Sequence, residues 1–340
     1  MTSRSRIGVG VIGVGATGHV HTENLAAQVP GAALAAVADV NGPAARVCAE
    51  ELGVAHAFED YRELLAHPEV QAVVICSPRG THARAVAEAA AAGKHVFCEK
   101  PIGCAPAEID AALAAVQKAG VKLQTGFNRR FDPDFRHVRD TIVAGAIGKP
   151  VIVHLVSRDP PQAGDGAGTI ADLFLETTVH DLDMARYLTA SEIESVYAIG
   201  SRAAGRGAEE ADAAVTTLRF AGGAIGTIDN SLRSAFGYDQ RAEVFGDRGA
   251  ISTANETAHR ATLSDSHGVH SPLPLPFFRE RYAASYVAEM RAFIDCIRDD
   301  SDPPVTGADG RAAVMLALAA MQSYREGRPV SPAEIEAAAG

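Results

Sequence analysis

The sequence contains no apolar run that approaches the length of a membrane span. Its first six residues lack the apolar core of a signal peptide and lead directly into a segment that predicts a strand. Basic residues are also few, with 31 Lys and Arg against 42 Asp and Glu and a formal net charge of -11. Because a general nucleic-acid-binding protein needs a basic face, this balance argues against that class. These absences predict a cytoplasmic protein that binds neither membranes nor nucleic acid.

Cysteine is scarce, and its spacing gives no sign of a metal site. The five cysteines are odd in number and include no C-x-x-C pair. This pattern argues against both a disulfide framework and a zinc site. We therefore expect buried free thiols in a reducing compartment. The residues concerned are Cys48, Cys76, Cys98, Cys104 and Cys296.

The length and composition are those of an ordinary globular protein of two domains, with 340 residues, 47% of them hydrophobic and 21% charged. Short apolar strands alternate with amphipathic helices up to Gly126. This alternation predicts an α/β domain with a doubly wound parallel sheet over residues 1–126. After that point strand follows strand with glycine turns, which predicts an α+β domain with an open, mainly antiparallel sheet over residues 127–340.

Periodicity and turn residues place the individual elements. In the first domain we expect strands at 7–12, 32–38, 70–76, 94–97 and 121–125, and helices at 19–28, 43–52, 61–66, 83–92 and 106–119. In the second domain we expect helices at 132–144, 173–188, 279–298 and 310–325, strands at 151–157, 215–220, 224–232 and 240–245, and proline-rich loops at 159–168 and 267–278.

The stretch from Ile7 to Asp39 combines a strand, a Gly-x-Gly-x-x-Gly turn, a helix, a second strand and an acidic residue. Gly13 allows the tight turn, Gly15 lets a pyrophosphate approach the backbone, and Gly18 lets the helix pack close to the sheet. The helix N-terminus offers N–H groups and a positive dipole end to the phosphates. Asp39 accepts hydrogen bonds from a ribose 2′-hydroxyl and repels a 2′-phosphate, so the motif favours NAD over NADP. The alternative is a glycine-rich turn that binds nothing, and the order of the surrounding elements argues against it.

Two loops are expected at the carboxyl edge of the same sheet, where doubly wound sheets bind their ligands. One runs from Ser77 to His82, and the other contains Glu99, Lys100 and Pro101. The residues predicted to bind the cofactor are Gly13, Gly15, Ala16, Thr17, Gly18, Asp39, Val40, Ser77, Pro78, His82, Glu99 and Lys100.

Lys100, Glu176 and His180 are the candidates for moving a proton. Oxidation by hydride transfer needs a group that takes the hydroxyl proton as hydride leaves the same carbon. Glu176 and His180 are four residues apart, so on a regular helix they share one face and tune each other's proton affinity. A simpler explanation is that Lys100 is an exposed loop lysine and that Glu176 and His180 form a surface pair. Glu176 and His180 could also be two ligands of a metal ion, but no third ligand stands at a recognisable spacing. His19 and His21, beside the glycine turn, are expected to pack or to face the cofactor.

A set of short motifs spread over the chain forms a wider pattern. They are Gly13-Val-Gly-Ala-Thr-Gly18, Ser77-Pro-Arg-Gly-Thr-His82, Gly93-Lys-His-Val-Phe-Cys-Glu-Lys-Pro101, Gly126-Phe-Asn-Arg-Arg-Phe131, Val179-His-Asp-Leu-Asp-Met-Ala-Arg-Tyr187, Gly237-Tyr-Asp-Gln-Arg-Ala-Glu-Val-Phe-Gly246, Phe278-Arg-Glu-Arg-Tyr282 and Val305-Thr-Gly-Ala-Asp-Gly310. With this pattern the sequence resembles the Gfo/Idh/MocA family (glucose–fructose oxidoreductase, inositol dehydrogenase and MocA) over nearly its whole length. Within the family it is most similar to the inositol 2-dehydrogenases.

The resemblance implies an NAD-dependent enzyme that oxidises a ring hydroxyl group of a cyclitol or sugar. Lys100 would contact the substrate and assist proton transfer, and His180 would be the general acid/base. Glu176 would bind the substrate and support His180. A homotetramer joined through the faces of the C-terminal sheets is also implied. The substrate-binding residues would be Lys100, Asn128, Arg129, Arg158, Asp159, Glu176, His180, Tyr238 and Tyr282.

Two departures from the family pattern concern the substrate. Glu176 stands where the inositol enzymes have Asp, which moves the carboxylate outward by more than about 1 Å. Positioning errors of that size are expensive in catalysis. Ala171-Asp172 replaces a Gly-Gly pair and places Asp172, a further candidate substrate-binding residue, near the pocket mouth. Added acid can recognise an amine, so the sequence raises the hypothesis of an aminocyclitol substrate; an Asp172 side chain that points elsewhere would count against it.

Two other functions stay open. An enzyme that retains its NAD could oxidise the substrate transiently and reduce it again after an epimerisation or elimination. Stoichiometric release of NADH separates this chemistry from net oxidation. A non-enzymatic Rossmann module that senses NAD(H) and binds a partner is the third possibility, but a regulator has no need of Lys100 and His180.

Overall fold

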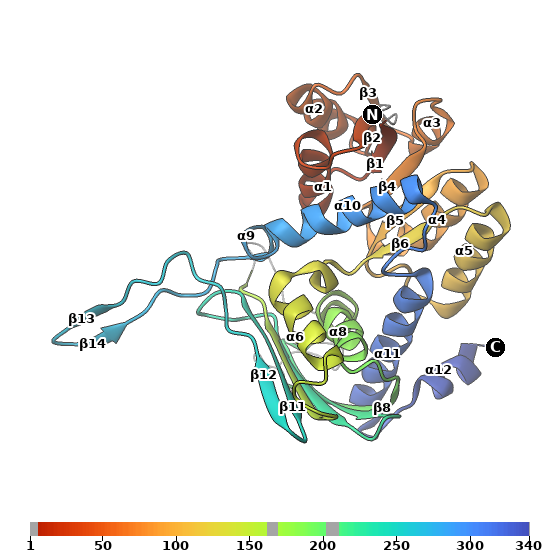
Figure 1. The fold of residues 1–340 in the computed structure, drawn as a ribbon. Coiled ribbons are helices and arrows are strands. Elements are labelled where there is room, and N and C mark those ends of the chain that lie inside the picture. Colours follow the sequence, from red (N-terminus) through yellow and green to blue (C-terminus); the bar gives the residue numbers. More distant parts are fainter. Residues whose placement is uncertain (1–5, 162–168, 202–210, 340) are drawn as a thin grey trace. The chain divides into compact units, whose positions relative to one another are not determined.

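The computed structural model describes residues 6–161, 169–201 and 211–339. Residues 1–5, where we expected no signal peptide, and residues 162–168 of the expected proline-rich loop lie outside the described residues. The chain forms two compact units (Figure 1). The first contains Met1–Phe131 and Ala284–Val314, and the second contains Asp132–Ala283 and Met315–Gly340.

The first unit is built on a parallel sheet of six strands in the order β3-β2-β1-β4-β5-β6. The strand order winds outward in both directions from β1, which is the doubly wound arrangement predicted from the sequence, and that prediction is confirmed. β3 was not predicted, because three half-buried residues are too few to form a pattern. The strands are β1 (Ile7–Ile12), β2 (Ala32–Ala38), β3 (His56–Phe58), β4 (Ala72–Ile75), β5 (His95–Glu99) and β6 (Leu123–Gly126).

The helices of this unit follow the predicted pattern closely. Gly53 and Gly120, which follow the expected helices 43–52 and 106–119, adopt the left-handed conformation after α2 and α5, each with φ of 66°. The elements are α1 (Ala16–Ala27), α2 (Gly42–Leu52), α3 (Tyr61–Ala66), η1 (Arg79–Thr81), α4 (His82–Ala91), α5 (Pro106–Ala119), η2 (Asn128–Phe131), α10 (Ala283–Asp299) and the first part of α11 (Gly307–Glu326).

The helix α10 returns to the first unit from a distant part of the sequence. Met290, Phe293 and Ile294 on this helix join the buried core that contains Val9 of β1 and Leu25 of α1. The division expected from the sequence, 1–126 and 127–340, assigned this helix to the second domain. The division found in the structure therefore differs, because an amphipathic helix carries no sign of which core its apolar face will join.

The second unit contains a mixed sheet of six strands in the order β12-β11-β7-β10-β9-β8. β10 runs parallel to β7, and the other neighbours are antiparallel, so the predicted open, mainly antiparallel sheet is confirmed. The strands are β7 (Pro150–Arg158), β8 (Ile193–Ser201), β9 (Ala213–Phe220), β10 (Ile225–Ser231), β11 (Asp239–Gly246) and β12 (Gly249–Ser252).

A two-stranded hairpin of β13 (Leu263–Asp265) and β14 (Gly268–His270) extends from this unit (Figure 1). The segment 267–278 was expected to be loop throughout, so β14 corrects that prediction. Its three residues are all exposed and carry no apolar alternation that the sequence could reveal.

The long helix expected at 173–188 is not one regular helix. Leu173–Thr178, labelled η3, is π-helical, and the backbone N–H of Val179 donates to the carbonyl of Phe174, five residues back. Similarly, the helix expected at 279–298 divides at Tyr282 into α9 and α10. The remaining helices of the second unit are α6 (Pro133–Val143), α7 (Ile170–Asp172), α8 (Val179–Thr189), α9 (Phe278–Arg281) and α12 (Pro332–Ala339).

Among the described helices, none has both the length and the apolar character needed to cross a bilayer.

Candidate active site

The glycine turn after β1 gives each of its glycines a different physical task. Gly13 has φ of 90°, and a Cβ there would lie 2.7 Å from the carbonyl oxygen of Cys76. A Cβ on Gly18 would lie 1.9 Å from the carbonyl oxygen of Gly13. A Cβ on Gly15 would meet no atom within 4 Å. Gly13 and Gly18 are therefore required by the fold, whereas Gly15 leaves open space beside the backbone.

The space beside Gly15 suits the pyrophosphate of a dinucleotide. Gly15 is the N-cap of α1, and no side chain caps that helix, so its N-terminal dipole is available to an anion. Asp39, at the end of β2, accepts hydrogen bonds from the backbone N–H groups of Val14 (2.9 Å) and Asn41 (2.8 Å). These bonds fix the Asp39 carboxylate beside the turn, where the ribose of NAD would lie in this fold. The residues present thus fit the cofactor predicted from the sequence.

The two loops at the carboxyl edge of the sheet are joined by His82. Its ring nitrogens lie 2.6 Å from the carbonyl oxygen of Ser77 and 2.8 Å from that of Pro101. The Ser77 hydroxyl is 2.7 Å from that of Thr81, so the first loop is also held internally. His82 is buried, and its contacts describe a residue that positions the two loops. Val40 and Pro78, also predicted at the cofactor, are exposed.

Lys100 lies directly after β5 and is half-buried, and the peptide bond between it and Pro101 is cis. The carboxylate of Glu99 is directed inward: one oxygen lies 2.7 Å from Nε2 of His21, and the other accepts the Lys100 backbone N–H at 3.2 Å. His21 is completely buried, whereas His19 is part-exposed and lies 3.2 Å from Glu23. Glu99 therefore fixes the backbone position of Lys100.

Asn128 and Arg129 lie on the short helix η2, at the end of the first of the two segments that make up the first unit. Both side chains are buried. The Asn128 amide donates to the hydroxyl of Ser285 on α10 at 3.2 Å. This contact ties η2 to the returning helix.

In the second unit, a row of polar residues crosses the sheet on its buried face. Ser157 of β7 pairs in register with Asn230 of β10 on one side and with Gln240 of β11 on the other. The side chains of all three are buried. Asp181 of α8 accepts hydrogen bonds from Ser157 (2.6 Å) and from the Asn230 amide (2.8 Å). The Asn230 amide oxygen accepts from the hydroxyl of Thr178 in η3, at 2.7 Å.

This polar row supports the segment that carries the predicted catalytic pair. Glu176 lies in η3 and His180 in the first turn of α8, and both are half-buried. Glu176 lies in a π-helical turn that directly precedes α8, and not in the single regular helix from which the shared face was predicted. π-Helical turns inside helices are frequent at functional sites. The network thus connects the sheet to the turn that orients Glu176 and His180.

Asp159 and Arg158 are neighbours in sequence but lie in different environments. Asp159 accepts hydrogen bonds from the Gln240 amide (3.2 Å) and from the hydroxyl of Thr177 in η3 (3.4 Å), so it belongs to the polar row. Arg158 instead binds Asp229 and Asp239. The hydrogen bond to Asp229 raises the pKa of the Arg158 guanidinium.

Tyr238 and Tyr282 pack against each other, with ring centroids 5.9 Å apart and planes nearly perpendicular. Both are buried, and the Tyr282 hydroxyl lies 3.5 Å from the Gln240 amide oxygen. The two tyrosines therefore form one apolar wall next to the polar row.

Asp172 has a structural explanation in its own helix. It forms a capping box with Thr169, whose backbone N–H (3.1 Å) and hydroxyl (2.7 Å) both donate to one oxygen of the Asp172 carboxylate. In return, the Thr169 oxygen accepts the Asp172 N–H at 3.1 Å. Such boxes stabilise helix starts. The acid at this position thus stabilises α7, which weakens the argument that it was placed there to recognise an amine.

The polar row was not predicted, although the sequence contains a signal for it. On the face of the sheet that carries the row, β7 places the buried residues Val153, Leu155 and Ser157, and β11 places the buried residues Val244, Ala242 and Gln240. At one end of the sheet, which is the C-terminal end of β7 and the N-terminal end of β11, the apolar pattern gives way to a buried polar residue. Buried polar side chains need partners, so this break in the pattern indicates a site.

Most of the sequence matches known families and proteins. Residues 7–127 match an oxidoreductase family described by its NAD-binding Rossmann fold, and residues 135–252 match the GFO/IDH/MocA C-terminal domain. The chain is 42% identical over 332 residues to myo-inositol 2-dehydrogenase of Thermotoga maritima, which covers 96% of this chain and 99% of that protein. It is 36% identical over 326 residues to scyllo-inositol 2-dehydrogenase (NAD(+)) of Bacillus subtilis, with 94% of each chain covered.

A solved structure is similar over the same extent. The crystal structure of scyllo-inositol dehydrogenase from Lactobacillus casei, with bound cofactor NAD(H) and scyllo-inositol, matches with a TM-score of 0.89 at 29% identity. It covers 97% of this chain and 100% of that one.

Proposed function

The chain belongs to the Gfo/Idh/MocA family of oxidoreductases, and we propose that it oxidises one ring hydroxyl group of an inositol, with NAD as the hydride acceptor. The observation that carries this proposal is the presence of Lys100, Glu176 and His180 in a chain that is similar over nearly its whole length to inositol 2-dehydrogenases. Family membership alone would give only the cofactor and the reaction class.

The proposed roles follow from the chemistry of each group. Lys100 binds the reacting hydroxyl and lowers its proton affinity by its positive charge, and His180 takes the hydroxyl proton as general base. Glu176 binds a neighbouring hydroxyl and holds the His180 ring. In the reverse direction His180 returns the proton. Asp159, held by Gln240 and Thr177, offers acceptors for further hydroxyl groups of the ring.

The first unit binds the cofactor. The turn at Gly15 and the N-terminus of α1 bind the pyrophosphate, and Asp39 binds the ribose and disfavours a 2′-phosphate. NAD supplies the hydride-accepting carbon when bound. Glu99 holds the backbone of Lys100 in place beside that cofactor.

Within the cyclitols, an unmodified inositol is the better substrate proposal. The aminocyclitol hypothesis depended on Asp172, whose carboxylate caps α7. Glu176 remains as the departure that bears on the substrate, and its longer side chain favours a change of preference among inositol stereoisomers. Epimerisation or elimination with retained NAD is not favoured, since the similar proteins are named as dehydrogenases.

The test is NADH formation by the purified protein. NAD and NADP are each supplied with myo-, scyllo- and D-chiro-inositol, with inosamines and with glucose. We expect turnover on an inositol with NAD, and a loss of about 10²-fold or more in kcat in Lys100→Met and His180→Asn. Lys118→Met, at the last turn of α5, is the matched control. Turnover on inosamines alone would restore the aminocyclitol hypothesis, and NAD that stays bound without net reduction would contradict the proposed reaction.

We further propose a cytoplasmic homotetramer joined through the exposed face of the second sheet. Three apolar side chains form a row there across β11, β7 and β10: Phe245 pairs with Ile152, and Ile152 pairs with Ile225. They are 49%, 41% and 55% exposed. An apolar row of this kind on an open sheet face favours burial against a second copy.

A further inference from the structure

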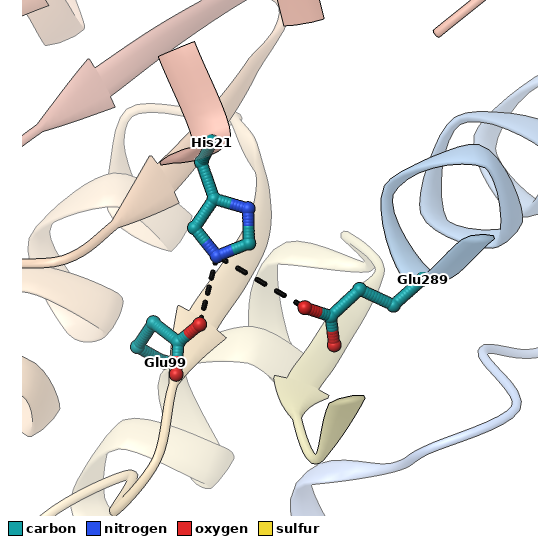
Figure 2. Close-up of side chains that lie close together, drawn as sticks. All are labelled: His21, Glu99 and Glu289. Carbon is teal, nitrogen blue, oxygen red and sulfur yellow. Dashed lines mark hydrogen bonds and ion pairs between the residues drawn. The ribbon is translucent and has the colours of Figure 1, made fainter. Parts of the chain in front are cut away.

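Three buried titratable side chains meet inside the first unit (Figure 2). His21 comes from α1, Glu99 from the end of β5, and Glu289 from α10. The sequence separates them widely, and only the return of α10 to this unit brings Glu289 to the other two. The cluster is linked directly to Lys100, because the Glu99 side chain also accepts the Lys100 backbone N–H.

The contacts within the cluster are unequal. His21 Nε2 lies 2.7 Å from an oxygen of Glu99, a hydrogen bond, but 4.0 Å from the nearer oxygen of Glu289. Glu289 is completely buried, and among the described residues neither of its carboxylate oxygens has a hydrogen-bond partner. A buried carboxylate that carries a charge without hydrogen bonds is costly. The geometry therefore favours a neutral Glu289, whereas the Glu99 oxygens have hydrogen-bond partners.

The surroundings of Glu289 point the same way. The titratable groups that face it are His21 from α1, Glu99 from β5 and the thiol of Cys76 after β4, with Cys98 of β5 next to that thiol. Burial raises the pKa of both thiols well above its usual value, so they add no charge. The rings of Phe97 and Tyr286 pack edge-on against His21 and exclude water. Burial, and secondly the charge of Glu99, raises the pKa of Glu289 well above 4.5.

A metal ion fits this geometry less well than a proton. Two ligand atoms on one tetrahedral zinc ion are about 3.3 Å apart, given metal–ligand distances near 2.05 Å. The 2.7 Å between His21 and Glu99 is shorter and is typical of a hydrogen bond.

We propose that Glu289 holds a proton in the folded enzyme, and that its neutral state lets the Glu99 side chain keep its bonds to His21 and to the backbone of Lys100. Glu289 is then a positioning residue for Lys100, acting through Glu99. When Glu289 ionises at high pH, two carboxylates face each other in an apolar site, and the hold on Lys100 weakens. The link to Lys100 rests on the proposed function, whereas the proton on Glu289 does not.

The first test is thermal stability against pH in the wild type and in Glu289→Gln. A group whose pKa is raised by folding stabilises the folded state fully below its unfolded pKa. This stabilisation is lost progressively as the pH rises from the unfolded pKa through the folded pKa. The wild type should therefore lose stability relative to Glu289→Gln from about pH 5 upward, with the unfolding constant rising about tenfold per pH unit. Glu23→Gln, on the exposed side of α1, should follow the wild type.

Parallel stability curves for the wild type and Glu289→Gln would overturn the proposal, since Glu289 would then be ionised. So would a rise in melting temperature on adding Zn²⁺ or Mn²⁺ that is absent in Glu289→Gln. Should Glu289→Gln not fold, infrared spectroscopy of the wild type near pH 8 decides the matter. The C=O band of a protonated carboxylic acid is expected, and its absence would contradict the proposal.

The second test is the pH profile of kcat with inositol and NAD. In Glu289→Gln the alkaline fall of kcat should move to higher pH, because the substituted side chain cannot ionise. An unchanged alkaline fall, together with the predicted stability curves, would remove the link to Lys100 and leave the proton on Glu289 intact. Absence of any inositol oxidation would instead count against the proposed function and leave the stability test unaffected.

Discussion

At the scale of single residues, the glycine turn separates what the fold needs from what the cofactor needs. Gly13 and Gly18 have backbone atoms within 3 Å of a built Cβ, whereas Gly15 has nothing within 4 Å. An added methyl group is therefore expected to disturb the fold at Gly13 and Gly18 but only cofactor binding at Gly15.

Gly15→Ala should fold like the wild type but bind NAD about tenfold or more weakly, because the methyl group occupies the approach of the pyrophosphate. Gly18→Ala should lose stability, since its Cβ would meet the Gly13 carbonyl at 1.9 Å. Melting temperatures and NAD titration of both variants check this contrast. Equal NAD affinity in Gly15→Ala and wild type would rule out this phosphate site.

Asp39 should determine the preference for NAD. In Asp39→Ser the ratio of kcat/KM for NAD to that for NADP should fall by about tenfold or more, because the negative charge that repels the 2′-phosphate is gone. Asp60→Asn, at the exposed N-cap of α3, is the control and should keep the wild-type ratio. An unaltered ratio in Asp39→Ser would place the selectivity elsewhere.

At the scale of elements, η3 is held by the sheet beneath it. Thr178 and Asp181 reach Asn230 and Ser157, so the π-helical turn and the start of α8 are fixed to β10 and β7. Because Glu176 and His180 lie on this segment, the polar row positions both side chains.

Thr178→Val should lower both stability and kcat. The substitution removes the hydroxyl that donates to the buried Asn230 amide oxygen, which costs about 1–3 kcal/mol in the free energy of unfolding. Thr189→Val is the control, because the Thr189 hydroxyl donates to the carbonyl of Ala185 within α8, and Thr189 lies at the opposite end of that helix from η3. A similar loss of stability with normal kcat is expected there. If both variants keep full kcat, the row has no positioning role.

At the scale of the whole molecule, the proposed tetramer depends on the exposed face of the second sheet. Its apolar row crosses three adjacent strands, and adjoining exposed apolar side chains favour contact with another protein surface.

Ile152→Asp and Phe245→Asp should each dissociate the proposed tetramer, because a charge would be buried at the centre of the interface. Light scattering after size exclusion measures the mass. Val143→Asp, on α6 and 66% exposed, should leave the mass unchanged. Wild-type mass in all three variants would show that the assembly uses another surface.

The sequence predicted the structure best where a local residue pattern has a single physical explanation. Alternating strands and helices indicated the parallel sheet, and the spacing of Gly13, Gly15 and Gly18 indicated the nucleotide turn. It revealed less where distant segments meet. The packing of α10, the row of Ser157, Asn230 and Gln240, and the position of Glu289 each depend on tertiary contacts. The π-helical form of η3 also has no local signal, since its residues suit a regular helix equally well.

The most direct measurement of the central claim uses an inositol deuterated on its ring carbons, with NAD and the purified enzyme. Mass spectrometry of the products follows the label. The proposed reaction predicts one deuterium in each reduced cofactor released and one equivalent of oxidised ring product. Deuterium that returns to a cyclitol, with no reduced cofactor released, would contradict net oxidation.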